Sequence, residues 1–337
     1  MKKLFYAINT LAATGLIFAY ISPYVKPSIT WFFSFFGLGY PFLLVTNILF
    51  VFFWLAIKPK YALTSGLIIA LGFIPLQKAI GFNKKSKETG ITLMTYNIGK
   101  TRLDFHNNKK RAKKIKRFKA FIKEEQPDII CIQERFPKHF EYYKKIFTDY
   151  NLYPNLNIGT AIYTKYPIVK GGNIPFNTMS HNGTWADLNI KGKIFRIYSI
   201  HLSSNHVNNL TDNYKDIIDE SKYILSKYNQ HAIIRAGQLK QILAHAAKSP
   251  HPVIISGDFN DVPQSYIYSM IDKDYTDAFR VAGRGLMQTY ISRFIGLRID
   301  FTFTSPNIEI YDHDIIKTNL SDHYPVVTTI NPITLEL

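Results

Sequence analysis

The distribution of apolar and polar residues divides the chain near residue 83. Before that point lie two uncharged apolar stretches, residues 4–22 and 31–57, and a third, residues 62–80, with Lys78 near its end. Each is about as long as the roughly 20 residues that a helix needs to cross a bilayer. We therefore predict a membrane anchor of about three transmembrane helices in residues 1–83, a polar linker at 84–90 and a folded head at 91–337.

Other interpretations of the apolar part remain open. A cleavable signal peptide is the weaker one, because residues 19–22 (AYIS) lack the small-x-small pattern of a cleavage site. The third stretch contains Pro75 and also fits a re-entrant or interfacial helix. No ionisable residue lies in the middle of a span, so anchoring is the simplest role. We expect an integral protein of a bacterial-type plasma membrane, whose orientation the flanking lysines, four against five, leave open.

Beyond residue 90, short apolar runs alternate with charged segments. Apolar residues at helical spacing predict helices at 107–125 and over most of 208–248, and buried or alternating runs predict strands between and after them. The strand pair 185–190 and 194–200 is separated by Lys191, Gly192 and Lys193 and indicates a hairpin. Interspersed helices and strands favour a mixed two-sheet α/β sandwich. The predicted strands are 91–97, 128–133, 160–164, 185–190, 194–200, 253–255, 298–304 and 326–330.

Charge adds one feature to this picture. The formal net charge is +17, which favours a polyanionic partner such as nucleic acid or an anionic membrane surface. Lysine and arginine fill the polar faces of the predicted helix 107–125. Those faces fit either contact with phosphates and lipid headgroups or simple solvation. The single cysteine, Cys131, lies in an apolar run and excludes an intramolecular disulfide.

Polar residues recur in or beside the predicted strands, most of them at strand ends. The stretch Pro252 to Asp261 (PVIISGDFND) is the clearest case, since a β-branched run ends in a glycine, a carboxylate and an amide. Strand ends are rigid places where distant side chains can converge on one cleft. Hydrolysis of a phosphoester needs a hard cation held by oxygen ligands, a base for water and donors for phosphoryl oxygens. The residues that offer this chemistry are Asn97, Glu134, His201, Asp258, Asn260, Asp300, Asp322 and His323.

Six short motifs contain these residues in series: TYN, IQE, SIHLSS, SGDFN, RIDFTF and SDHYPV. In this order they resemble the endonuclease/exonuclease/phosphatase family, which has the deoxyribonuclease-I-like fold. The resemblance covers about residues 91–330 and leaves the apolar segment unexplained. It implies a four-layer sandwich of two packed mixed sheets with helices outside, and it is specific for the superfamily rather than for a substrate.

The resemblance also implies a role for each residue. Glu134 would hold a metal with Asn97 and Asp322 beside it, and Mg²⁺, with Mn²⁺ as a substitute, suits a site with few carboxylates. Asp258 would orient or deprotonate water. The phosphate contacts would come from Asn260 and His201. His323 would act as a general acid/base or phosphate ligand, with Asp300 fixing its tautomer.

The chain departs from the family pattern in two places. The aromatic and tyrosine features that abasic-site endonucleases carry around their sites have no match in this sequence. In the deoxyribonuclease branch the histidine that corresponds to His201 contacts a glutamate, and residues 160–164 (TAIYT) supply none. Trp185 and Tyr290 fit a place in the lining of the cleft, but a core or rim position fits them better. We interpret five other histidines as surface or helix residues, namely His181, His206, His231, His245 and His251.

The sequence thus predicts a membrane-anchored, Mg²⁺-dependent phosphoesterase. The net charge and the basic helix slightly favour nucleic acid as substrate, whereas the anchor favours a membrane phospholipid, such as a phosphoinositide or sphingomyelin. A catalytically inactive, membrane-bound interaction module is the alternative from a different class.

Overall fold

A computed structural model describes residues 1–99, 108–135, 140–153, 159–176, 182–205, 217–291 and 296–331 of the chain. The chain forms two compact units. The first comprises Met1–Ala79, Ser204–Gly237 and Asp261–Met270, and the second comprises Ile80–Ser203, Gln238–Asn260 and Ile271–Leu337. The first unit therefore contains more than the predicted anchor, because two later segments of the chain pack with the apolar helices.

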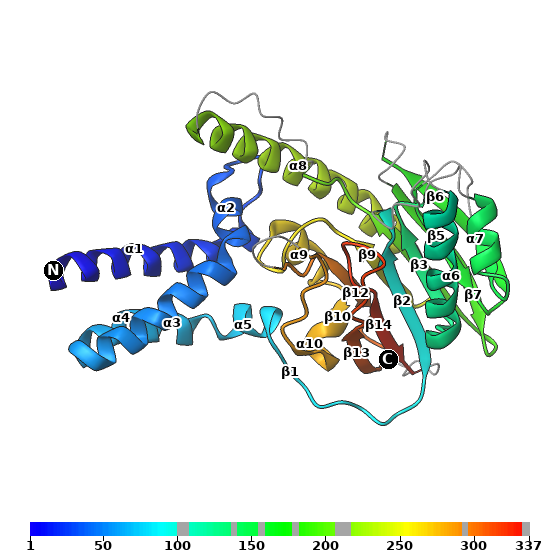
Figure 1. Ribbon diagram of the computed structural model, residues 1–337, viewed down its shortest axis with the longest axis horizontal. Helices are drawn as coiled ribbons and strands as arrows, with labels where there is room; N and C mark the ends of the chain where they lie inside the picture. Colours follow the sequence, from blue (N-terminus) through cyan, green and yellow to red (C-terminus); the bar gives the residue numbers. More distant parts are fainter. Residues whose placement is uncertain are drawn as a thin grey trace. The chain divides into compact units, whose positions relative to one another are not determined.

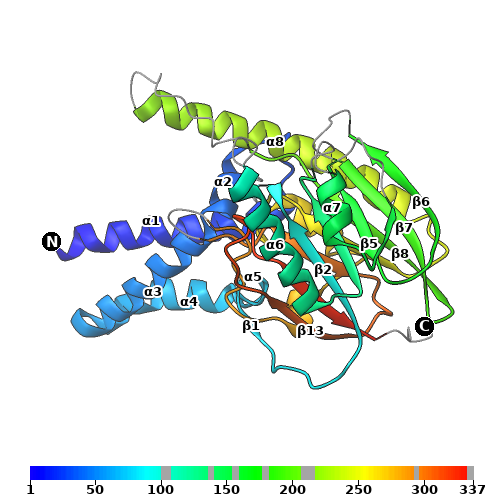
Figure 2. The same ribbon diagram turned by 45° about the vertical axis from the view of Figure 1, so that its right-hand side comes forward.

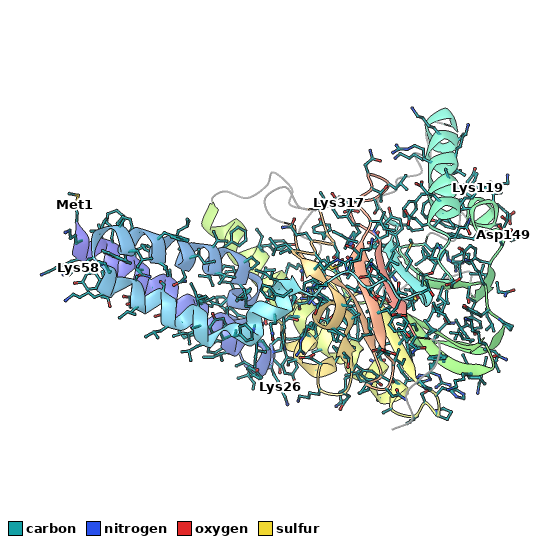
Figure 3. The ribbon with its side chains drawn as sticks, turned by 90° about the horizontal axis from the view of Figure 1, so that it is seen from below. Met1, Lys26, Lys58, Lys119, Asp149 and Lys317 are labelled. Atoms are coloured by element: carbon teal, nitrogen blue, oxygen red, sulfur yellow. The ribbon has the colours of Figure 1, made fainter. Side chains whose placement is uncertain are left out.

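Apolar helices make up most of the first unit. Two of them are long and apolar enough to cross a membrane: α1 (Lys2–Ile21) with its 3₁₀ extension η1 (Ser22–Tyr24), and α3 (Tyr40–Ile57). A third span is present if α4 (Ala62–Leu71), which follows η2 (Pro59–Tyr61), and α5 (Phe73–Ala79) count as one, although they are bent by 67° at Gly72. Figure 3 shows Met1 and Lys58 at one end of this bundle and Lys26 at the other.

The predicted span 31–57 differs from the structure. It consists of two helices, the short α2 (Phe32–Leu38) and α3, which meet at Gly39. Pro41 stands at the start of α3, where a missing N–H costs nothing because the first turn has no intrahelical partner for it. Apolar composition alone could not reveal this break.

A buried polar network joins three helices of the bundle. Asn9 of α1 donates to Ser65 of α4 at 2.5 Å and accepts a hydrogen bond from Trp54 Nε1 of α3 at 2.9 Å. Ser65 in turn donates to Asn47 Oδ1 of α3 at 2.8 Å. Such bonds hold apolar helices together where water is absent. They make α4 an integral part of the bundle.

Two six-stranded mixed sheets form the centre of the second unit. The first sheet has the order β13-β14-β2-β3-β5-β4, and the second has the order β10-β12-β9-β8-β7-β6. The first sheet contains β2 (Ile91–Asn97), β3 (Ile129–Gln133), β4 (Asn151–Tyr153), β5 (Ala161–Thr164), β13 (Ile310–Ile315) and β14 (Val326–Ile330). The second sheet contains β6 (Ile168–Pro175), β7 (Asn182–Ile190), β8 (Lys193–His201), β9 (Val253–Asp258), β10 (Thr276–Asp277) and β12 (Asp300–Thr304).

The two sheets pack face to face through apolar side chains such as Leu93, Cys131, Ile197 and Ile254. Helices α6 (Asn108–Glu125) and α7 (Phe140–Ile146) cover the outer face of the first sheet (Figures 1 and 2). The last turns of α8 (Ile217–Ala246) lie on the outer face of the second sheet, where His245 contacts Tyr198. The predicted four-layer sandwich is confirmed. Each sheet packs one face against the other sheet and the opposite face against helices.

The remaining short elements of the chain are α9 (Tyr266–Ile271), α10 (Ala278–Ala282), and β1 (Gly81–Phe82), which pairs with β11 (Arg284–Gly285). Strand β1 belongs to the second unit. In the sequence, Ile80 is the one residue between the end of α5 and the start of β1. The polar residues 84–90 thus follow the start of the second unit instead of preceding it.

Candidate active site

Four polar residues lie opposite one another in a row across the second sheet. Asn182 of β7 pairs with His201 of β8, His201 pairs with Asp258 of β9, and Asp258 pairs with Asp300 of β12. Residues paired in this way project from the same face of a sheet. Each is at most 2 % exposed. The row therefore gathers two carboxylates, an imidazole and an amide at one edge of the interface between the sheets.

A second row, two residues further along each strand, contains only hydroxyl side chains. Its members are Thr184, Ser199, Ser256 and Thr302, all fully buried. Ser256 Oγ lies 2.8 Å from Thr302 Oγ1, and Ser199 Oγ accepts a hydrogen bond from Gln133 of the facing sheet at 3.2 Å. The next row is largely apolar. Hydroxyl groups thus separate the ionisable row from the apolar core.

The first sheet brings two further residues to the same place. Asn97, the last residue of β2, donates through Nδ2 to Asp258 Oδ2 at 2.9 Å and to Glu134 Oε1 at 3.2 Å. Its Oδ1 accepts a hydrogen bond from the Gly99 amide at 3.0 Å. Since both N–H bonds and the carbonyl oxygen of the amide are used, Asn97 is held firmly between the carboxylates of the two sheets.

Two site residues adopt left-handed backbone conformations. Glu134, directly after β3, has φ +55°, and Asn260, two residues after Asp258, has φ +54°. Non-glycine residues in this region cluster at functional sites, because the surrounding structure must hold them there. Gly99 leaves room for this arrangement, since a Cβ at Gly99 would overlap the Glu134 carboxylate. The turn after β3 therefore aims a carboxylate toward Asn97 and His201.

The two histidines both lie close to the carboxylate of Asp258. His201 Nε2 lies 3.8 Å from Asp258 Oδ2 and 3.8 Å from Glu134 Oε1. His323 Nε2 lies 3.9 Å from Asp258 Oδ2, while its Nδ1 is hydrogen-bonded to Asp300 Oδ2 at 2.9 Å. Asp300 thus fixes the ring of His323 with Nε2 directed toward Asp258.

Burial and like charge change the acidity of this group. Burial and the neighbouring Asp300 raise the pKa of Asp258 to about 6, against the opposing effects of both histidines and Asn97. Burial alone would lower the pKa of His323, but the charge and hydrogen bond of Asp300, with Asp258 and Asp322, outweigh it and raise the pKa to about 9. At neutral pH a carboxylate that accepts a proton easily therefore lies beside an imidazolium.

Three of these side chains could together hold a cation. Ligand atoms of Asp258, Asp300 and His323 lie within 4.8 Å of one another. Asp300 Oδ1 is buried and has no hydrogen-bond partner in the described part of the chain. Oxygen-rich groups of this kind fit a hard divalent cation. The ligand set expected from the sequence, Glu134, Asn97 and Asp322, is a different combination and stays a prediction.

The remaining predicted residues border this group. The Asn260 backbone N–H donates to Asp258 Oδ1 at 2.8 Å, and its side-chain amide donates to the Leu202 carbonyl at 2.9 Å. The Asp322 carboxylate accepts a hydrogen bond from Ser321 Oγ at 3.3 Å. Tyr290 lies at the rim, with its ring 5.0 Å from that of His323.

Sequence reasoning missed Asn182 and Thr289. Thr289 Oγ1 accepts the backbone N–H bonds of Ile299 and Asp300 at 3.0 and 3.1 Å and so supports the start of β12. For Asn182 a signal was present, because a hairpin that pairs Ile190 with Lys193 also pairs residue 182 with His201.

The aromatic and histidine residues that we placed outside the site fall into three groups. His245 and Trp185 pack together at 5.1 Å on the outer face of the second sheet. His231 is a residue of α8, and His251 lies between α8 and β9. His181 and His206 lie outside the described residues.

The geometry agrees with the comparison to protein families. Residues 94–323 match the model of the endonuclease/exonuclease/phosphatase family. The chain belongs to this family. The match contains all eight of the residues predicted from the motifs, from Asn97 to His323. Proteins of this family hydrolyse phosphoester bonds, and the chain has their fold.

Solved structures of the endonuclease/exonuclease/phosphatase family share the two-sheet fold at low sequence identity. A family protein from Bacteroides vulgatus is 18% identical with a TM-score of 0.56, over 72% of this chain and 99% of that one. D. rerio TDP2 complexed with single-strand DNA product is 17% identical with a TM-score of 0.55, over 72% and 100%. Mannosyl-6-phosphatase Bt3783 of Bacteroides thetaiotaomicron is 16% identical with a TM-score of 0.53, over 71% and 99%.

The apolar segment has a separate match. Residues 2–79 fit the model of a domain of unknown function, DUF8431. A search of curated proteins gives no significant match to the sequence. The family assignment therefore concerns the second part of the chain, and the role of the apolar helices is a matter for proposal.

Proposed function

We propose that this protein is a membrane-anchored, Mg²⁺-dependent phosphoesterase. The convergence of Asp258, Asp300 and His323 with Asn97 and Glu134 carries this proposal. A binding module needs no buried carboxylate with a raised pKa beside a carboxylate–histidine pair, because each such group costs stability unless it serves chemistry.

Each residue has a task in this proposal. A divalent cation held by Glu134, with Asn97 and Asp322, would supply Lewis-acid stabilisation of the phosphoryl charge and would leave Asp258 and His323 free to move protons. Asp258 orients water and accepts its proton, which a pKa of about 6 favours near neutrality. His201 and Asn260 donate to phosphoryl oxygens. His323, protonated and oriented by Asp300, donates a hydrogen bond or a proton toward the leaving oxygen.

For the substrate we favour nucleic acid. Helix α6 carries nine lysine and arginine residues against two glutamates. Its apolar residues pack on the first sheet, and Lys113, Lys116 and Lys119 are exposed. Figure 3 shows Lys119 projecting away from the sheet. A row of exposed cations binds phosphates without regard to sequence. D. rerio TDP2, which has this fold, is known in complex with single-strand DNA product, and this supports nucleic acid as the substrate.

A membrane phospholipid is the second candidate, favoured by the apolar helices. Two or three of them could cross a bilayer, and only Ile80 separates the last from the first strand of the second unit. We propose that they make the protein an integral component of a plasma membrane. A short connection of this kind would keep the catalytic part near lipid headgroups.

The test uses the full-length protein in detergent, because the first unit contains segments from both sides of β9. Hydrolysis is measured against single-stranded DNA, RNA, a phosphoinositide and sphingomyelin, with Mg²⁺, with Mn²⁺ and with EDTA. We expect metal-dependent release of product from single-stranded DNA or RNA. Activity on a lipid alone would select the second candidate, and inertness on every substrate with no metal binding would leave a membrane-bound interaction module.

A further inference from the structure

Asn182 is the one member of the polar row that no motif of the sequence includes. It opens β7 directly opposite His201, so the two side chains leave the same face of the sheet at adjacent positions. Its side chain is 2 % exposed, like those of His201 and Asp300. By position and burial Asn182 therefore belongs to the same group as the catalytic residues.

The amide of Asn182 has a fixed orientation. Its Oδ1 accepts a hydrogen bond from Thr160 Oγ1 at 2.6 Å. Thr160 Oγ1 lies 2.7 Å from Thr184 Oγ1, which can donate to it in turn. These two hydroxyl groups leave Nδ2 as the end of the amide that faces away from the network. An amide held in this way presents N–H donors in a fixed direction.

The donor end of Asn182 has no hydrogen-bond partner within the described ranges of the chain. Buried donors without partners are rare in folded proteins, because each loses its bonds to water and gains nothing in return. They persist where a ligand completes them. The N–H groups of a side-chain amide are hydrogen-bond donors without charge. They fit a ligand that presents oxygen acceptors, such as an oxyanion.

We propose that Asn182 is a substrate-binding residue that donates a hydrogen bond to a phosphoryl oxygen beside His201. This rests on the proposed phosphoesterase function. Asn182 would then be a second amide donor to the phosphoryl group, besides Asn260, which was expected from the sequence. One N–H of the Asn260 amide already donates to the Leu202 carbonyl. The ligand is a phosphate ester or inorganic phosphate, whose oxygens accept the amide hydrogen.

The test compares Asn182→Asp with Asn189→Asp in the full-length protein. Both substitutions change an asparagine of β7 to aspartate, but Asn189 is exposed at the far end of the strand. At residue 182, aspartate keeps the acceptor for Thr160 and replaces the donor with a negative charge. We expect Asn182→Asp to lower kcat/KM for bis(4-nitrophenyl) phosphate by roughly 10- to 100-fold, with Asn189→Asp unchanged.

Binding of inorganic phosphate supplies a second readout that needs no turnover. Phosphate should raise the melting temperature of the wild-type protein and of Asn189→Asp, and this shift should disappear in Asn182→Asp and shrink in Asn182→Ala. The proposal fails if phosphate still raises the melting temperature of Asn182→Asp. It also fails if the loss of activity in Asn182→Asp is explained by a lower melting temperature of the variant in the absence of phosphate. A wild-type protein that binds phosphate but hydrolyses nothing would refute the proposed function and leave the binding role of Asn182 to the phosphate measurement.

Discussion

His323 and Asp300 form a carboxylate–histidine pair in which Nδ1 lies 2.9 Å from Oδ2. The two residues come from separate motifs, RIDFTF and SDHYPV, and both are buried. Because Nδ1 is bound to the carboxylate, Nε2 points toward Asp258. The pair thereby decides which nitrogen of the ring takes part in chemistry.

Replacing Asp300 with asparagine should separate charge from shape. The charge and hydrogen bond of Asp300 raise the pKa of His323, so Asp300→Asn should lower that pKa from about 9. We expect hydrolysis to fall by roughly 10²- to 10⁴-fold, since a general acid in the wrong protonation state or tautomer contributes little. NMR titration of the His323 ring measures the pKa. An unchanged pKa in Asp300→Asn would contradict the pairing, and the exposed Asp274→Asn serves as control.

Stability should depend on pH through Asp258 and His323. Both have pKa values raised in the folded state, so the folded protein binds their protons more tightly than the unfolded chain does. The stabilisation is complete below the unfolded pKa of each group. It is lost as the pH rises from about 4 through 6 for Asp258 and from about 6.5 through 9 for His323.

Melting temperatures in EDTA between pH 4 and pH 10 check this pH dependence. Without metal, the wild-type protein should become less stable as the pH rises through each of the two ranges. Asp258→Asn should remove the lower transition, and His323→Gln should remove the upper one. If the melting temperatures of the wild-type protein and of Asp258→Asn change equally between pH 4 and pH 6, the pKa of Asp258 is not raised in the folded protein.

Gly99 offers a test of Glu134 that leaves the carboxylate in place. Alanine at residue 99 would overlap the Glu134 carboxylate and push it away from Asn97 and His201. We expect Gly99→Ala to weaken metal-dependent hydrolysis by at least about 10-fold with little loss of stability, because geometry near the reacting groups controls rate steeply. Gly237→Ala is the control, since a Cβ there meets nothing. Equal activity of the two variants would show that the position of the Glu134 carboxylate does not matter for hydrolysis.

The basic face of α6 should bind substrate through charge. Changing Lys113, Lys116 and Lys119 to glutamine should weaken binding of a single-stranded oligonucleotide and reduce the slope of log affinity against log salt by roughly 0.7 for each phosphate that the helix no longer neutralises. Removing the same charge at three exposed lysines of the second sheet and its β7–β8 turn, Lys170, Lys191 and Lys193, should change little. Fluorescence anisotropy at several salt concentrations measures both. If the two triple variants behave alike, α6 presents only a solvated face.

The ionisable part of the site could be predicted because its residues lie at the ends of strands with a clear apolar pattern or beside such strands. Asp258 follows the buried run 253–255, and His201 ends a strand of alternating pattern. Asn182 escaped because its strand was predicted to start at Trp185, three residues too late. Extending the hairpin pairing beyond the apolar residues, as far as His201, would have placed residue 182 opposite that histidine.

Other parts of the fold carry too little pattern to be predicted. Strand β6 contains Gly171 and Gly172, and edge strand β13 (IYDHDI) is largely polar, so neither shows an apolar alternation. The break at Gly39 and the bend at Gly72 occur inside long apolar stretches whose composition and length fit a span. The packing of residues 204–237 and 261–270 with the apolar helices depends on tertiary contacts that no local pattern encodes.

The most direct test of the central claim is hydrolysis by the full-length protein with Asp258 changed to asparagine. Asparagine preserves the size of the side chain and can keep the Oδ1 contact with the Asn260 amide, but it cannot accept a proton from water. With Mg²⁺ present, we expect the wild-type protein to cleave the substrate that it hydrolyses best, and Asp258→Asn to be at least about 10³-fold slower while it still unfolds in one cooperative transition. Equal rates for the two proteins would show that this group of residues is not the active site.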